Sequence, residues 1–315
     1  MLAPIILFVY KRPWHTQRTL DALKNNHLSK SSFLFIFSDY CQYPEDKEAV
    51  LNVRKIINNL KGFKDISIIE KNNHEGLASS IINGVSYVFA KFSKAIILED
   101  DLLTSVNFLQ FMNQGLDFYR VDKRIFSISG YNYPIVIPSD YKYPVYLSYR
   151  ASSWGWATWK DRWNKADWQV KDYDKFKNDQ NAQLLFNKGG EDLTDMLDYQ
   201  MRGYIDSWAI RWCYTHFKNH AFCLHPTVSK VRNIGLDGTG THKTRRKIDP
   251  LFDTGREILI LNHNLKIDDE IINNFSLYFK KGIKGKTVDF LKKNFFRMSN
   301  LNDWLRSSSK IYILS

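Results

Sequence analysis

Apolar residues in the first 130 positions follow two alternating periods. Short, continuous apolar runs, which are typical of buried strands, lie at residues 3–10, 32–39, 65–70 and 94–99. Between them, apolar residues recur at helical spacing in segments 14–26, 45–60 and 76–92. Strict alternation of strand and helix predicts βαβ units, with a mostly parallel, Rossmann-like sheet and helices on both of its faces. The chain is therefore predicted to have an α/β fold.

The pattern changes after residue 130. Residues 131–250 are rich in aromatic side chains and interrupted by Pro and Gly, and they predict further strands with long excursions between them. Within this part, residues 190–220 have a helical periodicity that is broken near Gly203, so two helices are expected there. Beyond residue 250 the apolar pattern thins, then returns among basic residues. We predict three parts: residues 1–130, residues 131–250, and a basic, amphipathic C-terminal extension over residues 251–315.

Composition limits the classes of protein that need to be considered. The 315 residues are 44% hydrophobic, which is enough for a sizeable core. The apolar runs have the length of strands, far below the roughly 20 residues of a membrane-spanning helix. The first run lacks the pattern of a secretory signal. Three cysteines without a CxxC pair agree with a reducing compartment. We therefore expect a cytoplasmic protein.

The net charge of +12 is concentrated at one end of the chain. Residues 280–315 contain nine Lys or Arg and two Asp, so this segment carries +7 of the +12. A basic segment attracts nucleic acid, anionic lipid or phosphorylated substrates, and charge alone does not choose among them. The apolar stripe in this segment fits either docking on its own domain or contact with an anionic membrane surface, which would place the protein peripherally on the inner face of the plasma membrane.

Polar residues follow each of the first four predicted strands. Arg12 follows the first strand, Asp39 the second, residues 72–76 the third and residues 99–101 the fourth. In an open parallel sheet, ligands bind beyond the carboxyl ends of the strands. The four loops are therefore expected to converge on one site.

Three consecutive acids end the fourth strand: Glu99, Asp100 and Asp101. Ionised groups that leave water cost several kcal/mol unless they are paired or bind a metal. The acids therefore indicate either a solvated turn or a site for a cation. Carboxylate oxygens suit Mg²⁺ or Mn²⁺, which could then neutralise a diphosphate leaving group. The three acids by themselves do not decide between these two interpretations.

Seven segments, taken together and in order, resemble a known family. They are FVYKRPWHTQRTLDAL, FIFSDY, HEGLASSIINGV, ILEDDLLTS, SSWGWATWKDRW, DSWAIRW and NIGLDGTGTH. The chain resembles bacterial family-2-like glycosyltransferases of polysaccharide clusters, which have the GT-A fold and some of which carry a hemolysin-related label. It is more distantly similar to N-acetylglucosaminyltransferases with a Glu-Asp-Asp form of the DxD motif. The resemblance covers about residues 3–245.

The resemblance implies an enzyme and its substrates. It implies a metal-dependent transferase that moves a sugar from a nucleotide-diphosphate donor, with a UDP-sugar favoured. The acceptor is expected to be a glycan or a lipid-linked saccharide in the synthesis of a surface polysaccharide such as lipopolysaccharide. Inversion at the anomeric carbon is expected, and nucleic acid is not an expected partner.

The same resemblance assigns residues to the donor. Asp101 matches the acid that binds Mn²⁺ or Mg²⁺, whereas Glu99 and Asp100 match acids that hold the ribose and the donor sugar. Asp39 matches the acid that hydrogen-bonds the base. The remaining residues expected near the nucleotide are Arg12, His74 and Gly76. The residues themselves leave simpler roles open, namely a capping acid, a surface arginine and a helix-entry glycine.

Further residues are assigned to catalysis and to the acceptor. Asp206 matches the general base, although an acid at the start of a helix is also a common N-cap. His242 matches a late histidine that completes the metal shell or touches the diphosphate, although a lone histidine is most often structural or exposed. Trp154 and Trp156 are candidates to line the sugar site, because indole faces pack against sugar rings. The helical spacing of Trp156 and Trp159 favours a core position for at least one of them.

Two rival classes remain to be compared with this hypothesis. A sugar-nucleotide nucleotidyltransferase resembles a chain with a glycine-rich phosphate loop directly after the first strand, where this chain has YKRPWHT without glycine. A non-enzymatic carbohydrate-binding protein would use the aromatic residues but would leave the three acids unexplained. The sequence therefore favours the glycosyltransferase.

Overall fold

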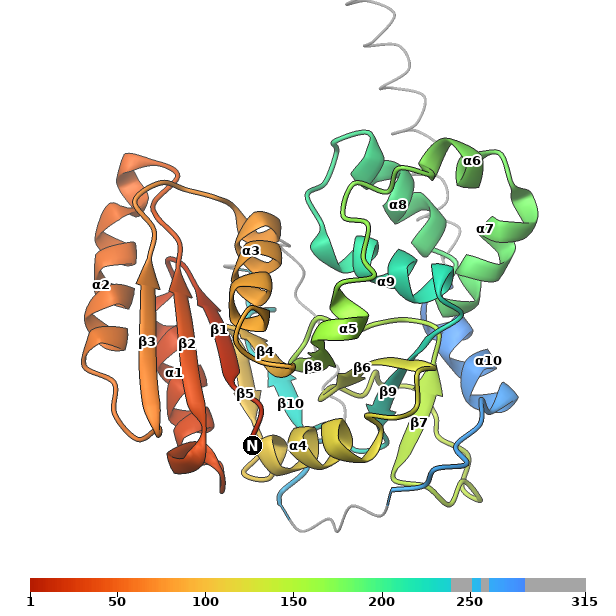
Figure 1. Ribbon diagram of the computed structural model, residues 1–315, viewed down its shortest axis with the longest axis horizontal. Helices are drawn as coiled ribbons and strands as arrows, with labels where there is room; N and C mark the ends of the chain where they lie inside the picture. Colours follow the sequence, from red (N-terminus) through yellow and green to blue (C-terminus); the bar gives the residue numbers. More distant parts are fainter. Residues whose placement is uncertain (239–250, 256–260, 281–315) are drawn as a thin grey trace, which may run out of the picture. The chain divides into compact units, whose positions relative to one another are not determined.

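The strands and helices predicted for the first hundred residues are present in the predicted order (Figure 1). The computed structural model describes residues 1–238, 251–255 and 261–280. The elements of this half are β1 (Ile5–Val9), α1 (Pro13–Lys24), β2 (Phe33–Ser38), α2 (Lys47–Asn58), β3 (Asp65–Glu70), α3 (Leu77–Phe89) and β4 (Lys94–Glu99). The four strands pair in parallel in the order β3-β2-β1-β4. The prediction of βαβ units is confirmed for this half.

The second half extends the same sheet with strands of both directions. The added strands, in spatial order after β4, are β8 (Trp156–Trp159), β6 (Ile125–Ser129), β9 (Phe222–Pro226) and β7 (Val145–Ser148). β8 is antiparallel to both β4 and β6, β6 is parallel to β9, and β7 is antiparallel to β9. The sheet is therefore parallel over its first four strands and mixed beyond them. The α/β class is confirmed.

Most of the remaining elements surround this sheet. The helices are α4 (Phe108–Phe118), α5 (Lys160–Trp163), α6 (Tyr173–Lys177), α7 (Gln180–Phe186), α8 (Leu193–Met201), α9 (Trp208–Lys218) and α10 (Asp269–Tyr278), with short 3₁₀ turns η1 (Ser29–Ser31), η2 (Pro44–Asp46) and η3 (Asn187–Gly189). A small antiparallel sheet joins β5 (Leu102–Thr104) to β10 (Val231–Asn233). The predicted break near Gly203 is confirmed, because this residue lies between α8 and α9 with φ at 74°.

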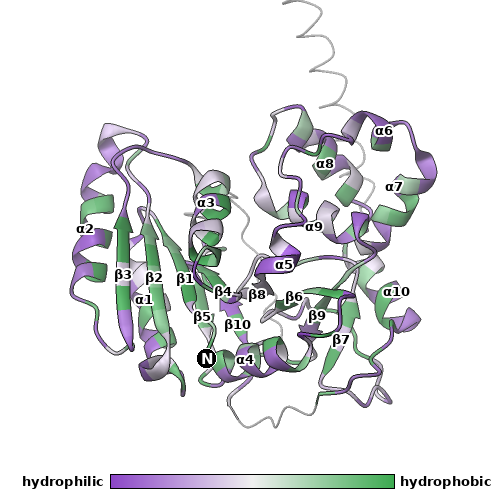
Figure 2. Ribbon diagram, in the orientation of Figure 1, coloured by the Kyte–Doolittle hydropathy of each residue, from purple (hydrophilic) through white to green (hydrophobic). Residues whose placement is uncertain are grey.

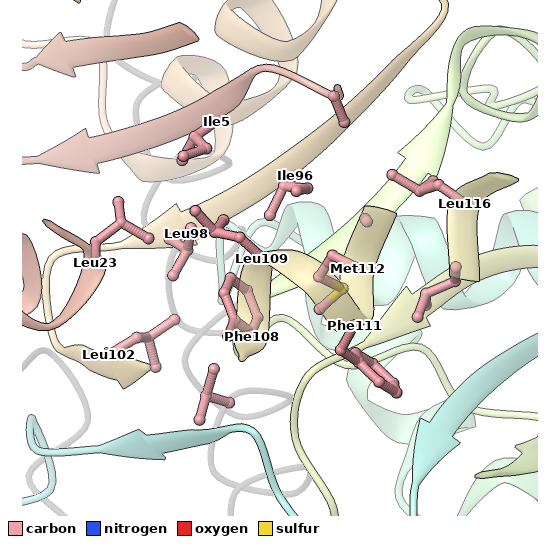
Figure 3. Packing of buried hydrophobic residues seen from close by; sticks show 14 of the residues in the cluster. Ile5, Leu23, Ile96, Leu98, Leu102, Phe108, Leu109, Phe111, Met112 and Leu116 are labelled. Atoms are coloured by element: carbon pink, nitrogen blue, oxygen red, sulfur yellow. The ribbon is translucent and has the colours of Figure 1, made fainter. Parts of the chain in front are cut away.

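Alternate residues of the central strands enter two separate cores, one on each face of the sheet. Ile5 and Leu7 of β1 join the core that is covered by α1, α2 and α4, whereas Ile6 and Phe8 join the core that is covered by α3 and α9. Figure 3 shows Ile5 and other strand residues of the first core with the side chains of α4. Figure 2 shows largely hydrophobic strands next to helices that carry hydrophilic residues. Helices on both faces are thus confirmed.

Part of the predicted C-terminal extension packs with the sheet. Residues 1–278 form one compact unit. Within it, Ser229 forms a parallel bridge to Phe252, and the buried ammonium of Lys230 lies 2.7 Å from the buried carboxylate of Asp253. Phe275 of α10 packs edge-on against Tyr133, with ring centroids 5.1 Å apart. The basic residues from 281 onward lie outside the described residues. Among the described helices, none combines the length and apolarity needed to cross a membrane.

Candidate active site

Strand register brings the predicted polar residues to one edge of the sheet. Val9 of β1 pairs with Ser38 of β2, and Phe8 pairs with Glu99 of β4. The residues that follow these positions therefore leave the sheet side by side. Arg12, Asp39 and the acids after β4 lie on adjacent strand ends, as the parallel arrangement predicted.

Arg12 supplies positive charge to the acidic turn. Its guanidinium donates a hydrogen bond to Asp100 Oδ1, and its Nη2 lies 3.0 Å from Asp101 Oδ2. The backbone N–H of Tyr10 also points at Asp100, at 3.4 Å. Asp100 is only 5% exposed, so this arginine compensates a carboxylate that has lost most of its water. Within the part of the chain that the structure describes, one positive charge nevertheless faces three acids.

Thr19 of α1 fixes the backbone of the same turn. Its hydroxyl donates to the carbonyl of Asp100 at 2.8 Å and accepts from the N–H of Leu102 at 3.1 Å. Thr19 is fully buried, so this bridge is shielded from water. This bridge could not be predicted from the sequence, because a threonine within a helical pattern carries no signal of a distant partner.

Two acids of this turn, Glu99 and Asp100, resist ionisation. Loss of hydration raises the pKa of Glu99 to about 8, with further repulsion from Asp101 and Asp100 and a smaller opposing effect from Arg12. Loss of hydration also raises the pKa of Asp100, although Arg12 opposes that shift. A cation placed between these oxygens would favour their charged forms. The electrostatics of the turn therefore match a site that binds positive charge.

The oxygens that remain open suit a hard divalent ion. Among the described residues, no group donates a hydrogen bond to the carboxyl of Glu99 or to Oδ1 of Asp101. The described part of the chain contains no group of three or more His, Cys, Asp or Glu that could hold a metal. Mg²⁺ and Mn²⁺ commonly need only one or two protein carboxylates when substrate phosphates complete the shell. The residues fit such an ion.

Asp39 organises the loop that precedes α3. Its carboxylate accepts hydrogen bonds from the backbone N–H groups of Tyr40 and Glu75, both at 2.9 Å, and of Gly76, at 3.1 Å. His74 Nδ1 lies 2.8 Å from Asp39 Oδ2. Gly76 has φ at 76°, a conformation that favours glycine, and it is the N-cap residue of α3. These contacts hold the loop in place, and contact with a nucleotide base stays a prediction.

Asp206 lies next to this loop but does not cap α9. The cap is Ser207, whose hydroxyl accepts from the N–H of Ile210 at 3.3 Å. The side chain of Asp206 is 64% exposed and pairs with Arg211 at 3.1 Å. A Cβ built on Gly76 would lie 3.9 Å from Asp206 Oδ2. The structure thus brings Asp206 next to the loop before α3 and rejects the capping alternative.

Ile234 and Gly235, which directly follow β10, lie against the acidic turn. The N–H of Ile234 donates to the carbonyl of Asp101 at 2.9 Å. A Cβ on Gly235 would overlap Asp101 Oδ2 and would lie 2.8 Å from Arg12 Nη1. Gly235 belongs to the NIGLDGTGTH motif, but the sequence did not predict a role for it, because its necessity depends on a contact that exists only in the folded chain. His242 lies outside the described residues, so its role as a metal ligand stays a prediction.

The two candidate tryptophans differ in burial. Trp156 is 1% exposed and stacks on Trp208 at a centroid distance of 5.0 Å, so the prediction that it contacts sugar is wrong. Its spacing to Trp159 was also misread as helical, because both residues belong to strand β8, where both are buried. Trp154 is only partly buried and packs edge-on against Tyr131, at 4.4 Å. Its contact with sugar stays a prediction.

Comparisons with known proteins give similarity at the level of structure. No protein-family model and no curated protein matches the chain. It is similar to mannosyltransferase PcManGT from Pyrobaculum calidifontis in complex with GDP-Man and Mn²⁺ (10% identity, TM-score 0.35), over 52% of this chain and 47% of that one. It is similar to S. aureus TarS in complex with UDP-GlcNAc (12% identity, TM-score 0.35), over 54% and 47%. It is also similar to a UDP-glucose pyrophosphorylase complexed with UDP-glucose (13% identity, TM-score 0.31), over 52% and 79%.

These similarities are limited in extent. The matched region spans about half the length of both glycosyltransferases. The structures similar to this chain include glycosyltransferases, as the sequence predicted, and also a pyrophosphorylase. TM-scores below 0.5 add no argument about the chemistry of this chain, which has to be inferred from the site itself.

Proposed function

We propose that this chain is a metal-dependent glycosyltransferase of the GT-A type. The observation that carries the proposal is the acidic turn after β4, where Arg12 leaves an excess of negative charge and leaves carboxylate oxygens open. A divalent cation and a nucleotide-diphosphate sugar would together complete this site. A UDP-sugar is the favoured donor, and a glycan or lipid-linked saccharide of a surface polysaccharide is the favoured acceptor.

The donor would bind across the ends of β1, β2 and β4. Asp101 and Glu99 present the oxygens for Mn²⁺ or Mg²⁺. When bound, the ion would supply charge stabilisation to the diphosphate leaving group. The loop of His74 and Gly76, which Asp39 holds rigid, would contact the nucleotide. Because this loop is fixed before the donor arrives, less conformational entropy would be lost on binding.

Asp206 is the proposed general base. Its carboxylate is exposed and lies close to the donor-side loop, so it is accessible to an acceptor hydroxyl. Arg211 holds one of its oxygens, Oδ1, and leaves Oδ2 to accept the hydroxyl proton. Attack by the resulting oxygen nucleophile on the side of the anomeric carbon opposite the diphosphate would invert its configuration.

The test is transfer, measured as nucleotide diphosphate released from a panel of UDP- and GDP-sugars with lipid-linked and free saccharide acceptors. Wild type is expected to release the diphosphate with Mn²⁺ or Mg²⁺ and to lose activity in EDTA. Asp101→Asn is expected to abolish transfer, whereas Asp65→Asn, at an exposed acid that begins β3, is the matched control. Full activity in EDTA or in Asp101→Asn would refute the proposal. Release of pyrophosphate while the protein makes a UDP-sugar from UTP and a sugar phosphate would instead identify a nucleotidyltransferase.

A further inference from the structure

Arg12 occupies one oxygen of a carboxylate that a metal ion would need. Its Nη2 lies 3.0 Å from Oδ2 of Asp101, and the same guanidinium donates to Asp100. Metal–oxygen bonds of Mg²⁺ are about 2.1 Å long. A divalent ion bound to this same oxygen, Oδ2, would therefore lie roughly 5 Å or less from the guanidinium nitrogen. Two cations at that separation repel each other strongly in a partly dehydrated site.

The packing around Arg12, Asp100 and Asp101 strengthens the attraction between the guanidinium and the two carboxylates. Asp100 and Asp101 have side chains that are 7% and 13% exposed, and the side chain of Arg12 is 21% exposed. The backbone of Gly235 lies against both partners so closely that a Cβ there would lie 2.8 Å from Arg12 Nη1. Few water molecules can therefore screen the charges, and charge-assisted hydrogen bonds are strongest where water is excluded.

We propose that Arg12 is an internal counter-cation that competes with the divalent metal for Asp101. The inference rests on the proposed metal site, but it concerns the binding of metal alone rather than transfer. In the absence of nucleotide, the Arg12 guanidinium stays bound to Asp100 and Asp101 and weakens metal binding. Arg12 is thus a positioning residue whose charge sets how much metal the protein needs.

Lys11 provides a matched control for the charge of Arg12. It is the adjacent residue and carries the same charge, but its ammonium binds Asp46 of η2 at 2.8 Å rather than the acidic turn. Lys11→Gln and Arg12→Gln therefore remove one positive charge at nearly the same place in the chain. The difference between them isolates direct competition from the general effect of net charge.

The experiment measures the affinity of full-length protein for Mn²⁺ alone, by isothermal titration calorimetry and by the loss of the free Mn²⁺ signal in electron paramagnetic resonance. Arg12→Gln is expected to bind Mn²⁺ about tenfold or more tightly than wild type. The factor corresponds to one charge-assisted hydrogen bond that the metal no longer has to displace. Lys11→Gln is expected to change the affinity by about threefold at most. Adding Asp101→Asn to Arg12→Gln is expected to remove the gain.

Several results would overturn the inference. They are equal affinity in Arg12→Gln and wild type, weaker binding in Arg12→Gln, an equal gain in Lys11→Gln, or no Mn²⁺ binding to any variant. Thermal unfolding shows whether each variant is folded. If Arg12→Gln does not fold, Arg12→Lys replaces it, because lysine keeps the charge but lacks the planar guanidinium. Arg12→Lys is expected to give a smaller gain in Mn²⁺ affinity. Failure of the proposed function is separate, because tighter Mn²⁺ binding without any sugar transfer would support competition and refute the transferase.

Discussion

Glu99→Gln tests the electrostatics of the acidic turn. Glutamine has nearly the same shape as protonated glutamate but does not ionise. In the folded protein, loss of hydration together with Asp101 and Asp100 raises the pKa of Glu99 from 4.5 to about 8. The folded state therefore keeps a proton that the unfolded chain releases. Because the folded state binds more protons between these two pH values, its stability falls as pH rises through this window.

The size of the effect follows from proton linkage. One pKa unit corresponds to about 1.36 kcal/mol, so the raised pKa of Glu99 destabilises the fold by roughly 3 kcal/mol at pH 7 and by roughly 1 kcal/mol at pH 5. Glu99→Gln removes this pH-dependent penalty. The stability advantage of the variant over wild type is expected to grow by about 2 kcal/mol from pH 5 to pH 7. It should be larger still at pH 8.

The assay is urea unfolding of wild type and variant at pH 5, 6, 7 and 8, followed by tryptophan fluorescence and far-ultraviolet circular dichroism. EDTA is present throughout, because a bound cation would stabilise the ionised form of Glu99 and reduce the effect. Glu48→Gln is the matched control, since Glu48 is exposed on α2. Its difference from wild type is expected to vary little with pH.

A difference between Glu99→Gln and wild type that stays constant from pH 5 to pH 8 would refute the reasoning. It would mean that Glu99 ionises in the folded state as easily as in water, and that the turn does not accumulate unfavourable negative charge. A difference with the opposite slope would mean that the ionised carboxylate is stabilised, and Arg12 would then be the group to examine.

Three further predictions concern other contacts. Gly235→Ala should cost about 1–3 kcal/mol of stability and lower transfer, because the added Cβ overlaps the acidic turn, and an unchanged Tm would contradict this. Lys230→Met should cost about 3 kcal/mol at pH 7, because it removes the ammonium that neutralises the buried Asp253 carboxylate, which keeps hydrogen bonds from the Asn107 amide and the Gly255 N–H. The difference in free energy of urea unfolding between wild type and Lys230→Met should narrow below about pH 4, because Asp253 becomes protonated there. A difference that does not change with pH would exclude the Asp253 charge as the cause. Trp156→Ala should cost about 3–5 kcal/mol in the same assay, whereas Trp154→Ala should lower sugar transfer with little loss of stability, and the reverse ranking would contradict the assignment of core and site.

The sequence by itself determined the α/β class, the order of β1 to β4 with their helices, and the side of the sheet where the site lies. These properties depend on local periodicity and on the rule that parallel strands end at one edge. The acids of residues 99–101 could be placed there because their position follows from the end of a single strand. The break before α9 was also local, because Gly203 marks it.

Only the tertiary structure decided how the residues of the site contact one another and that Gly235 joins them. β8 inserts antiparallel between β4 and β6, and this pairing buries Trp156, whose spacing to Trp159 suggested a helix. Arg12 and Gly235 reach the acids from segments far apart in the chain. No local pattern encodes such contacts, because each depends on how two distant segments pack once the sheet has formed. For the same reason, the burial that raises the pKa of Glu99 exists only in the folded chain.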